Sequence, residues 1–426
     1  MDSKPENTLH RAIGKLGFGA ININSVIGAG IFGLPAVVAA KAGFFSPWAF
    51  LLGGLLVITI VLSIARAASM FRSTGGVIVY ATSAFGPFVG FQTGWLSYLS
   101  RVAAMGANTN LLVTYASWFW APLDDNPWRA LALTILIGLM TWLNVAGVKN
   151  SITATYVFTV LKLVPLSLLV LFGMGEVDFS VLMHGADLPE FGKLGEIILV
   201  LLYAYVGFEG TVVIAGEGKS PRKDLPVALL HSIIFVGIFY FLIQTVALFT
   251  LSDLATSNAA LADMAFVLFG QVGAAVLIMG AIFSISGNLF ASLLSAPRTT
   301  FALALAGDLP QWFSVIHEKH RTPHHSIWFY GFLCLVMALS GSFIWLAIMS
   351  TVVRLMSYMV CIAALPILEK TNEPYEGQFK IPGSWLIPAV AFFLCLWLLT
   401  QASLDAWLTM LGFFVVGSGL YWYSRR

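Results

Sequence analysis

The sequence predicts an all-α protein that crosses a membrane about twelve times. Hydrophobic residues make up 59% of the chain and charged residues 10%, whereas a soluble domain carries about 25% charged residues. Apolar runs of about 20 residues, enough to span a bilayer, follow one another along the chain, and two of them are interrupted by glycine. The composition excludes a large soluble domain, and the net charge of +2 does not indicate nucleic-acid binding.

The first apolar run covers residues 16–40 and is interrupted in its middle. Gly28, Ala29 and Gly30 lie at its centre, and Pro35 follows. Lipid offers no partner to backbone N–H and C=O groups, so a spanning helix can break only where protein buries the break or where it lines a cavity. Because freed N–H groups at a helix N-terminus bind anions, this break is a candidate binding site.

Two other motifs resemble cofactor sites but lack the required context. Gly28, Gly30 and Gly33 spell G-x-G-x-x-G, yet a dinucleotide site needs a preceding strand and a βαβ unit, and both flanks here are apolar. The histidine-rich segment over residues 317–325 contains H-E-K-H rather than the H-E-x-x-H of a zinc helix, so a solvated loop is the favoured interpretation over a metal site. We therefore expect no cofactor and no metal.

The sixth apolar span repeats the pattern of the first, because Gly207 and Gly210 interrupt it. Interrupted spans at matching positions in two halves are typical of inverted repeats with a binding site at the breaks. We predict a cytoplasmic tail, two inverted repeats of five helices and two added helices, at residues 1–15, 16–174, 195–367 and 386–423. By length and hydropathy, the spans cover residues 16–40, 47–70, 88–117, 129–147, 152–174, 195–216, 226–250, 272–306, 325–341, 343–367, 386–402 and 405–423.

Charge placement predicts that both termini are cytoplasmic. With the N-terminus inside, the inner segments hold most of the lysines and arginines, whereas the outer segments hold only Lys41, Arg129 and Lys193. Positively charged loops remain on the cytoplasmic side of a membrane. We therefore expect a multi-pass protein of the plasma membrane, in contact with lipid.

Few ionisable residues lie within the predicted spans, and each is a functional candidate because charge inside a bilayer is costly. Glu209 lies in the break of the sixth span, where it could take up and release a proton or hold the break through backbone N–H groups. Arg101 could face a bound substrate, pair with Glu209 or pack against Asn108. Arg354 is interpreted as a contact between helices or at an inner gate.

Lys162 lies in the middle of the fifth span. A buried ammonium there could stand where a sodium ion would sit, joining backbone carbonyls of the first span to hydroxyl groups of the eighth, such as Ser284 or Ser286. A sodium ion would then be unnecessary. The alternative is an interfacial lysine with its stem in lipid, but a position in mid-span favours burial.

Several separated motifs resemble those of the amino acid–polyamine–organocation (APC) transporters. They are VIGAGIFGLP in the first span, YAYVGFEG in the sixth with GEGKSPRKDLPVAL after it, SGNLFASLLSAPRTTFALALAGDLP at the end of the eighth, and RLMSYMVCIAALPIL in the tenth. The resemblance covers most of the chain and implies two inverted five-helix repeats with broken helices 1 and 6. It also matches Lys162 to a lysine of sodium-independent members and Glu209 to a carboxylate of a subset.

By this resemblance, the substrate is an amino acid held between the two breaks. Its carboxylate would bind backbone amides of the first break, and its ammonium would meet carbonyls of the second. Ala29 replaces a hydroxyl residue of some members, so a side-chain contact to the carboxylate is lost. We expect substrate contacts from Ser25, Gly28, Ala29, Gly30, Tyr203, Ala204, Tyr205 and Gly207, and coupling or gating roles for Lys162, Glu209, Ser284, Ser286 and Arg101.

The sequence thus predicts a sodium-independent amino acid transporter, not an enzyme, that works by alternating access with proton symport or exchange. Neutral substrates are favoured because Glu209 and Arg101 could satisfy each other. A polyamine or organic-cation carrier is the first alternative, although it would favour acidic side chains and only Glu209 is evident. A sensor that binds without transporting is the second, although such proteins usually carry longer tails or an added domain. The oligomeric state stays open.

Overall fold

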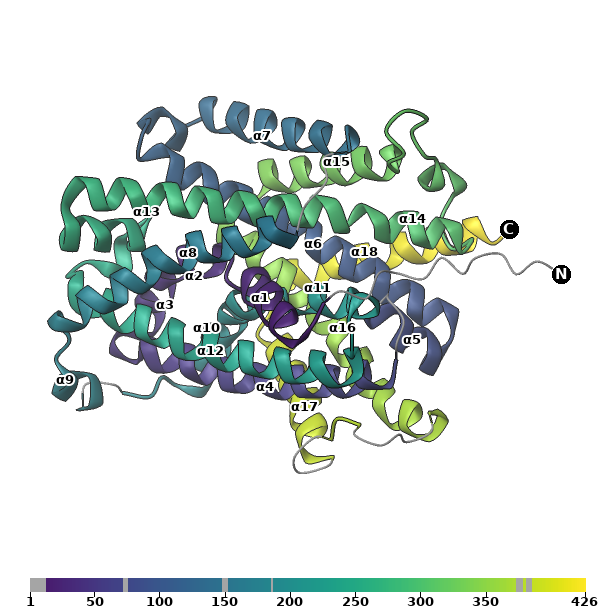
Figure 1. The fold of residues 1–426 in the computed structure, drawn as a ribbon, viewed down its shortest axis with the longest axis horizontal. Coiled ribbons are helices and arrows are strands. Elements are labelled where there is room, and N and C mark those ends of the chain that lie inside the picture. The colour runs from purple at the N-terminus through teal and green to yellow at the C-terminus, as the bar shows by residue number, and fades with distance from the viewer. Residues whose placement is uncertain (1–12, 72–75, 148–151, 185–186, 373–377, 381–384) are drawn as a thin grey trace.

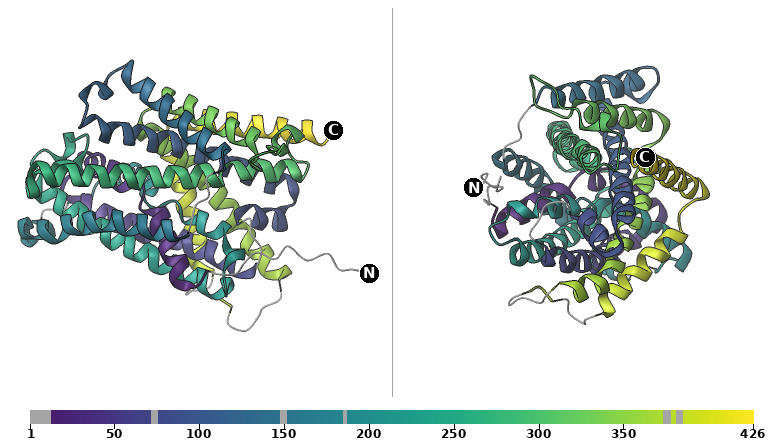
Figure 2. Two further views of the ribbon diagram at one scale, coloured as in Figure 1. Left: turned by 45° about the horizontal axis from the view of Figure 1, so that its top comes forward. Right: turned by 90° about the vertical axis from the view of Figure 1, so that its right-hand side faces the viewer.

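The computed structural model describes residues 13–71, 76–147, 152–184, 187–372, 378–380 and 385–426, so most of the predicted tail over residues 1–15 lies outside the described residues. Within the described residues the chain forms helices and no β-strand, which confirms the predicted all-α class. Figure 1 shows most helices running along the long axis of the molecule, and the right-hand view of Figure 2 shows them nearly end-on as a bundle. We name its two ends after α9 (Phe179–His184) and α14 (Pro297–Leu305), which lie at opposite ends.

Each of the twelve predicted spans corresponds to a helix or to a group of consecutive helices. Two short helices, α5 and α9, were not predicted. The bounds are α1 Lys15–Val26, α2 Ala29–Gly33, α3 Pro35–Ala42, α4 Ser46–Met70, α5 Val77–Phe85, α6 Pro87–Ser117, α7 Trp128–Val145, α8 Ile152–Gly173, α10 Phe191–Tyr205, α11 Phe208–Val213, α12 Pro221–Thr250, α13 Ala260–Ser295, α15 His324–Ser340, α16 Phe343–Thr371, α17 Leu386–Thr400 and α18 Leu404–Ser424.

The outer surface and the helix lengths suit a lipid environment. Eight helical segments of the described residues are long and apolar enough to cross a membrane, and α15 and α17 are shorter apolar helices. α6 is more polar because it runs through the middle of the bundle, where most of its side chains are buried. Large apolar side chains such as Leu171, Val272 and Phe393 are exposed. The chain is a multi-pass membrane protein.

One predicted boundary is wrong by a wide margin. The eighth span was placed at residues 272–306, whereas α13 begins at Ala260 and α14 ends at Leu305. Gly270 has a positive φ of 70° and interrupts the helical backbone. The segment before this glycine, over residues 260–269, is also apolar, so the predicted span wrongly began only after the glycine.

The two predicted interruptions are present and lie against each other. α1 ends at Val26 and α2 begins at Ala29, whereas α10 ends at Tyr205 and α11 begins at Phe208. A Cβ atom built on Gly30 would lie 2.5 Å from the Cα of Ala204, so only glycine permits this approach. The assignment of the two halves to inverted repeats stays a prediction.

Candidate functional site

The first break frees backbone groups at the centre of the bundle. Ile27 and Gly28 are non-helical, with ψ angles of 84° and −142°. The N–H of Gly28 donates to the carbonyl oxygen of Val26 at 2.8 Å, so it is already engaged. The N–H groups of Ala29 and Gly30 begin α2 and have no acceptor within their own helix, which leaves them as donors for a ligand.

Lys162 of α8 binds the carbonyl side of the same break. Its Nζ donates to the carbonyl oxygens of Asn24 at 3.0 Å and Ile27 at 2.8 Å, and the side chain is 2% exposed. These carbonyls belong to the end of α1, where helical acceptors lack helical donors. A positive charge therefore sits where the broken helix presents its negative end.

The second break is organised by a carboxylate. Gly207 adopts a left-handed conformation with φ 117°, and its N–H donates to Oε2 of Glu209 at 3.0 Å. The hydroxyl of Tyr358 donates to the same oxygen at 3.1 Å, and Nη1 of Arg354 binds Oε1 at 2.5 Å. Glu209 and Arg354 are both buried. Each oxygen of the carboxylate thus has a partner, as a buried charge requires.

The ion-pair partner of Glu209 is Arg354, so the suggestion that Arg101 pairs with Glu209 is not what the structure has. Arg101 instead places Nη1 at 3.4 Å from the Oγ of Ser295 on α13. Arg354 and Tyr358 are four residues apart on α16 and therefore share one helix face. That spacing indicates a shared face, but it does not identify Glu209 as the partner, because the pairing depends on how α16 packs against the second break.

A cavity of about 130 Å³, here called the central cavity, lies between the two breaks. It brings together most of the expected site residues. Its lining includes Ser25, Gly28, Ala29, Gly30, Arg101, Tyr203, Gly207 and Glu209. Because Glu209 is neutralised by Arg354, Arg101 is the cation of this lining without a carboxylate partner among the described residues.

Five expected site residues, Lys162 among them, lie outside the lining of the central cavity. Ala204 packs against Gly30, and the hydroxyl of Tyr205 points away to donate to the carbonyl oxygen of Phe50 at 2.6 Å. Ser284 is buried, but among the described residues its Oγ has no hydrogen-bond partner. No described hydrogen bond joins Lys162 to Ser284 or to the half-buried Ser286.

Two asparagines of the central cavity were missed as site residues. Asn108 of α6 and Asn288 of α13 both line it, and Nδ2 of Asn108 donates to Oδ1 of Asn288 at 3.2 Å. The hydroxyl of Tyr203 donates to Oδ1 of Asn108 at 2.5 Å, and Nδ2 of Asn288 donates to the carbonyl oxygen of Ser25 at 3.3 Å. The amides thus connect both breaks, and their rarity in apolar spans was the available signal.

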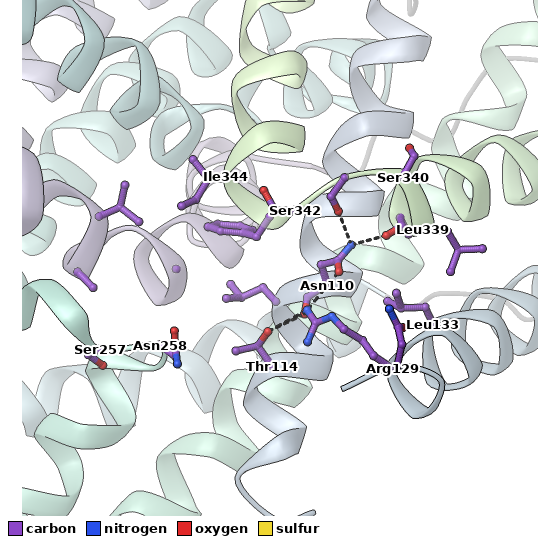
Figure 3. Close-up of a pocket in the computed structure, with 18 of the residues that line it drawn as sticks. Asn110, Thr114, Arg129, Leu133, Ser257, Asn258, Leu339, Ser340, Ser342 and Ile344 are labelled. Atoms are coloured by element: carbon purple, nitrogen blue, oxygen red, sulfur yellow. Dashed lines mark hydrogen bonds between the residues drawn. The ribbon is translucent and has the colours of Figure 1, made fainter. Parts of the chain in front are cut away.

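A second hollow of about 1000 Å³, here called the vestibule, lies between the central cavity and the α9 end. Its walls come from α3, α6, α7, the segment before α13, and the α15–α16 turn, and Figure 3 shows part of them. The ring of Phe343 lines the vestibule and meets Tyr203 edge-on, with ring centroids 5.8 Å apart. A Cβ on Gly33 would lie 2.4 Å from this ring. Phe343, which lines the vestibule, and Tyr203, which lines the central cavity, therefore pack together where the two cavities approach each other.

The comparison with known proteins agrees with this architecture. Residues 16–420 match the family described as amino acid permease, and the chain belongs to this family. Amino acid permeases are transporters of the APC superfamily and not enzymes.

Three proteins of Bacillus subtilis illustrate the similarity. The serine/threonine exchanger SteT is 29% identical over 91% of this chain and 90% of its own length. The branched-chain amino acid permease BcaP is 26% identical over 99% of this chain and 94% of its own length. The methylthioribose transporter is 26% identical over 98% of this chain and 94% of its own length. The family match and the similarity to SteT and BcaP support amino acid transport as the general activity.

Proposed function

We propose that this protein is a sodium-independent transporter of neutral amino acids that works by alternating access, coupled to protons or to exchange. The observation that carries the proposal is the pair of hydrogen bonds from Lys162 to the carbonyl oxygens of Asn24 and Ile27. The ammonium provides at this break the positive charge that a bound sodium ion would otherwise provide. Transport then needs no sodium ion at this position.

The substrate lies in the central cavity, with its carboxylate on the free N–H groups of Ala29 and Gly30. Its ammonium faces the carbonyl groups at the end of α10, where Tyr203, Ala204 and Tyr205 form the last turn. Opposed half-helix ends of this kind suit a zwitterion. Asn108 and Asn288 hold the walls between the breaks and offer amide groups to the substrate side chain.

The charges of the central cavity disfavour cationic substrates, although the Arg101–Glu209 pair that favoured neutral ones in the sequence is replaced by the Arg354–Glu209 pair. Glu209 is occupied by Arg354, Tyr358 and Gly207, so it does not offer a free carboxylate to a cationic side chain. Arg101 adds a positive charge to the same lining, which repels polyamines and other organic cations. The organic-cation alternative is disfavoured for this reason.

The contact between Phe343 and Tyr203, where the two cavities approach each other, supports alternating access. With both termini cytoplasmic, the α14 end faces the cytoplasm and the vestibule opens to the outside of the plasma membrane. Movement of α1–α2 and α10–α11 relative to the other helices would open the central cavity to one side at a time. Glu209 joins the second break to α16 and is the proposed site of proton coupling.

The test is uptake of labelled amino acids into proteoliposomes, with and without sodium, a proton gradient or unlabelled amino acid inside. We expect uptake of neutral amino acids that is unchanged when sodium is replaced by potassium. Uptake that requires internal amino acid identifies exchange, whereas gradient-driven uptake into empty vesicles identifies proton symport. Sodium-dependent uptake, or binding without any transport, contradicts the proposal.

A further inference from the structure

The vestibule contains a cation that the proposed transport mechanism does not use. The described lining includes two ionisable side chains, Lys41 and Arg129, and both are positive. The ammonium of Lys41 is paired with Oε2 of Glu196 at 2.9 Å. Arg129 has no carboxylate within 4.0 Å among the described residues. Its charge is therefore available to a ligand.

Neutral groups hold Arg129 in a fixed position. Its Nη2 donates to the backbone oxygen of Asn110 at 3.0 Å, to Oδ1 of Asn110 at 3.2 Å and to Oγ1 of Thr114 at 3.1 Å. Asn110 is 3% exposed, and its Nδ2 donates to the carbonyl oxygen of Ala338 at 2.9 Å. Figure 3 shows this cluster on one wall of the vestibule. A buried, hydrogen-bonded anchor places the guanidinium in advance of any ligand, which lowers the entropic cost of binding.

The guanidinium retains donors for an anionic group. A guanidinium carries five N–H donors, and no described residue accepts a hydrogen bond from Nε or Nη1 of Arg129. Arginine binds carboxylates through two parallel hydrogen bonds, which gives geometric selectivity as well as affinity. We therefore expect the remaining N–H donors of Arg129 to bind the carboxylate of a ligand in the vestibule.

A neighbouring hollow carries the opposite charge. It measures about 600 Å³, and it shares Thr114, Ser257 and Asn258 with the vestibule. Its ionisable lining consists of three carboxylates, Asp124, Asp253 and Asp263. A molecule at the shared rim therefore has a cation on one side and carboxylates on the other. A zwitterion matches both sides, whereas a simple anion or cation matches one.

We propose that Arg129 forms a second amino acid binding site, a loading site in the vestibule. It binds the carboxylate of an incoming amino acid while the ammonium faces the acidic hollow, before Phe343 moves and the substrate enters the central cavity. This inference rests on the proposed transport function and adds a step to it. Because fixed charges in a cleft raise the local substrate concentration, the loading site accelerates entry from the α9 end alone.

The test compares the two sides of the membrane in three variants. Uptake into intact cells presents substrate to the α9 end in the predicted orientation, and uptake into inside-out vesicles presents it to the α14 end. For Arg129→Gln we expect the half-saturation concentration in cells to rise about tenfold, with no change in inside-out vesicles. Arg129→Lys should recover part of the loss, because an ammonium keeps the positive charge but not the two parallel hydrogen bonds of a guanidinium. Lys193→Gln is the matched control, because this exposed lysine near the start of α10 lies outside the described lining of the vestibule, and it should behave like wild type.

The outcomes separate this inference from the transport proposal. Wild-type kinetics for Arg129→Gln on both sides, while the wild-type protein transports amino acids, would overturn the loading site and leave the proposed function intact. An equal loss on both sides would also overturn it, because a loosened contact between α6 and α7 has no sidedness. The difference between wild type and Arg129→Gln should shrink at about 1 M salt, where the Debye length is about 3 Å. Failure of the wild-type protein to transport any amino acid would overturn both proposals.

Discussion

At both helix breaks a charged side chain binds the unpaired backbone groups, but the two charges are opposite. At the first, the end of α1 presents carbonyl groups, and the ammonium of Lys162 binds two of them. At the second, the N–H of Gly207, the residue before α11, donates to the carboxylate of Glu209. Each charge matches the dipole of the half-helix end that it contacts.

The breaks differ in the sequence separation between the broken segment and the charged residue that stabilises it. Lys162 comes from α8, more than 130 residues after the carbonyls that it binds, whereas Glu209 lies two residues after Gly207 on the broken helix itself. Glu209 is in turn paired with Arg354 of α16. The first break is thus controlled by a cation from another helix, and the second by a carboxylate that moves with it.

Lys162→Ala should have the largest effect, because it removes the charge from the first break and leaves two buried carbonyl groups without a donor. Each buried acceptor left without a donor costs about 1–3 kcal/mol, so transport should fall by about 100-fold or more while the protein still folds. Uptake normalised to membrane abundance measures this. Lys193→Ala is the control, since Lys193 is exposed near the start of α10. Wild-type-like uptake by Lys162→Ala would show that the first break needs no cation.

Glu209→Gln should have the next largest effect, because Arg354 then lacks its counterion although the side chain keeps its size. Loss of a buried charge partner predicts a fall in uptake of at least about tenfold. If Glu209 couples transport to protons, the residual uptake should no longer vary with pH. Initial uptake rates across the acidic to neutral range measure this, with Glu196→Gln as an exposed control. A reduced rate with an unchanged pH profile would assign Glu209 a structural role.

Gly207→Ala tests whether the second break depends on its backbone conformation as well as on its charge. A left-handed conformation costs a non-glycine residue about 1–2 kcal/mol, and the new Cβ would lie 2.5 Å from the carbonyl oxygen of Ser25. We expect a roughly tenfold loss of uptake and a lower melting temperature. Gly138→Ala on α7 is the control, because a Cβ there meets nothing within 4 Å. Equal behaviour of the two variants would argue against close contact between the breaks.

Asn288→Ala should have the smallest effect of these variants, and it acts on the first break. It removes the hydrogen bonds to the carbonyl oxygen of Ser25 and from Asn108, and a neutral hydrogen bond contributes about 1 kcal/mol. Substrate affinity should fall about fivefold, with the sodium and pH responses unchanged. Equilibrium binding of a labelled substrate measures this. A changed pH response would instead link Asn288 to the coupling at Glu209.

The spans and both breaks could be predicted from the sequence because lipid imposes strict local rules. A spanning helix must be apolar over about 20 residues, and its backbone must be satisfied throughout. Glycine and proline within such a run, as at Gly28, Gly30 and Pro35, are therefore informative without any knowledge of neighbouring helices. The same rules made Lys162 and Glu209 conspicuous as rare charges within apolar runs.

The partners of these charges could not be predicted, because they depend on how each helix is rotated about its axis. Arg101 and Arg354 were both available to Glu209, and only the packing of α16 against the second break selects Arg354. Ser284 and Ser286 are two residues apart on a helix and point to nearly opposite faces, so both could not serve Lys162. In the structure the described hydrogen bonds of Lys162 go to backbone carbonyls.

The sequence by itself determined the class of protein, the number of crossings and the positions of the two breaks, since each follows from local composition in a medium without water. Only the tertiary structure decided that Asn108 and Asn288 join the breaks, that Phe343 packs against Tyr203, and that Arg129 has no carboxylate partner among the described residues. These features join residues that are far apart in the chain. Their side chains meet because of helix packing, and packing is not encoded in the periodicity of any single span.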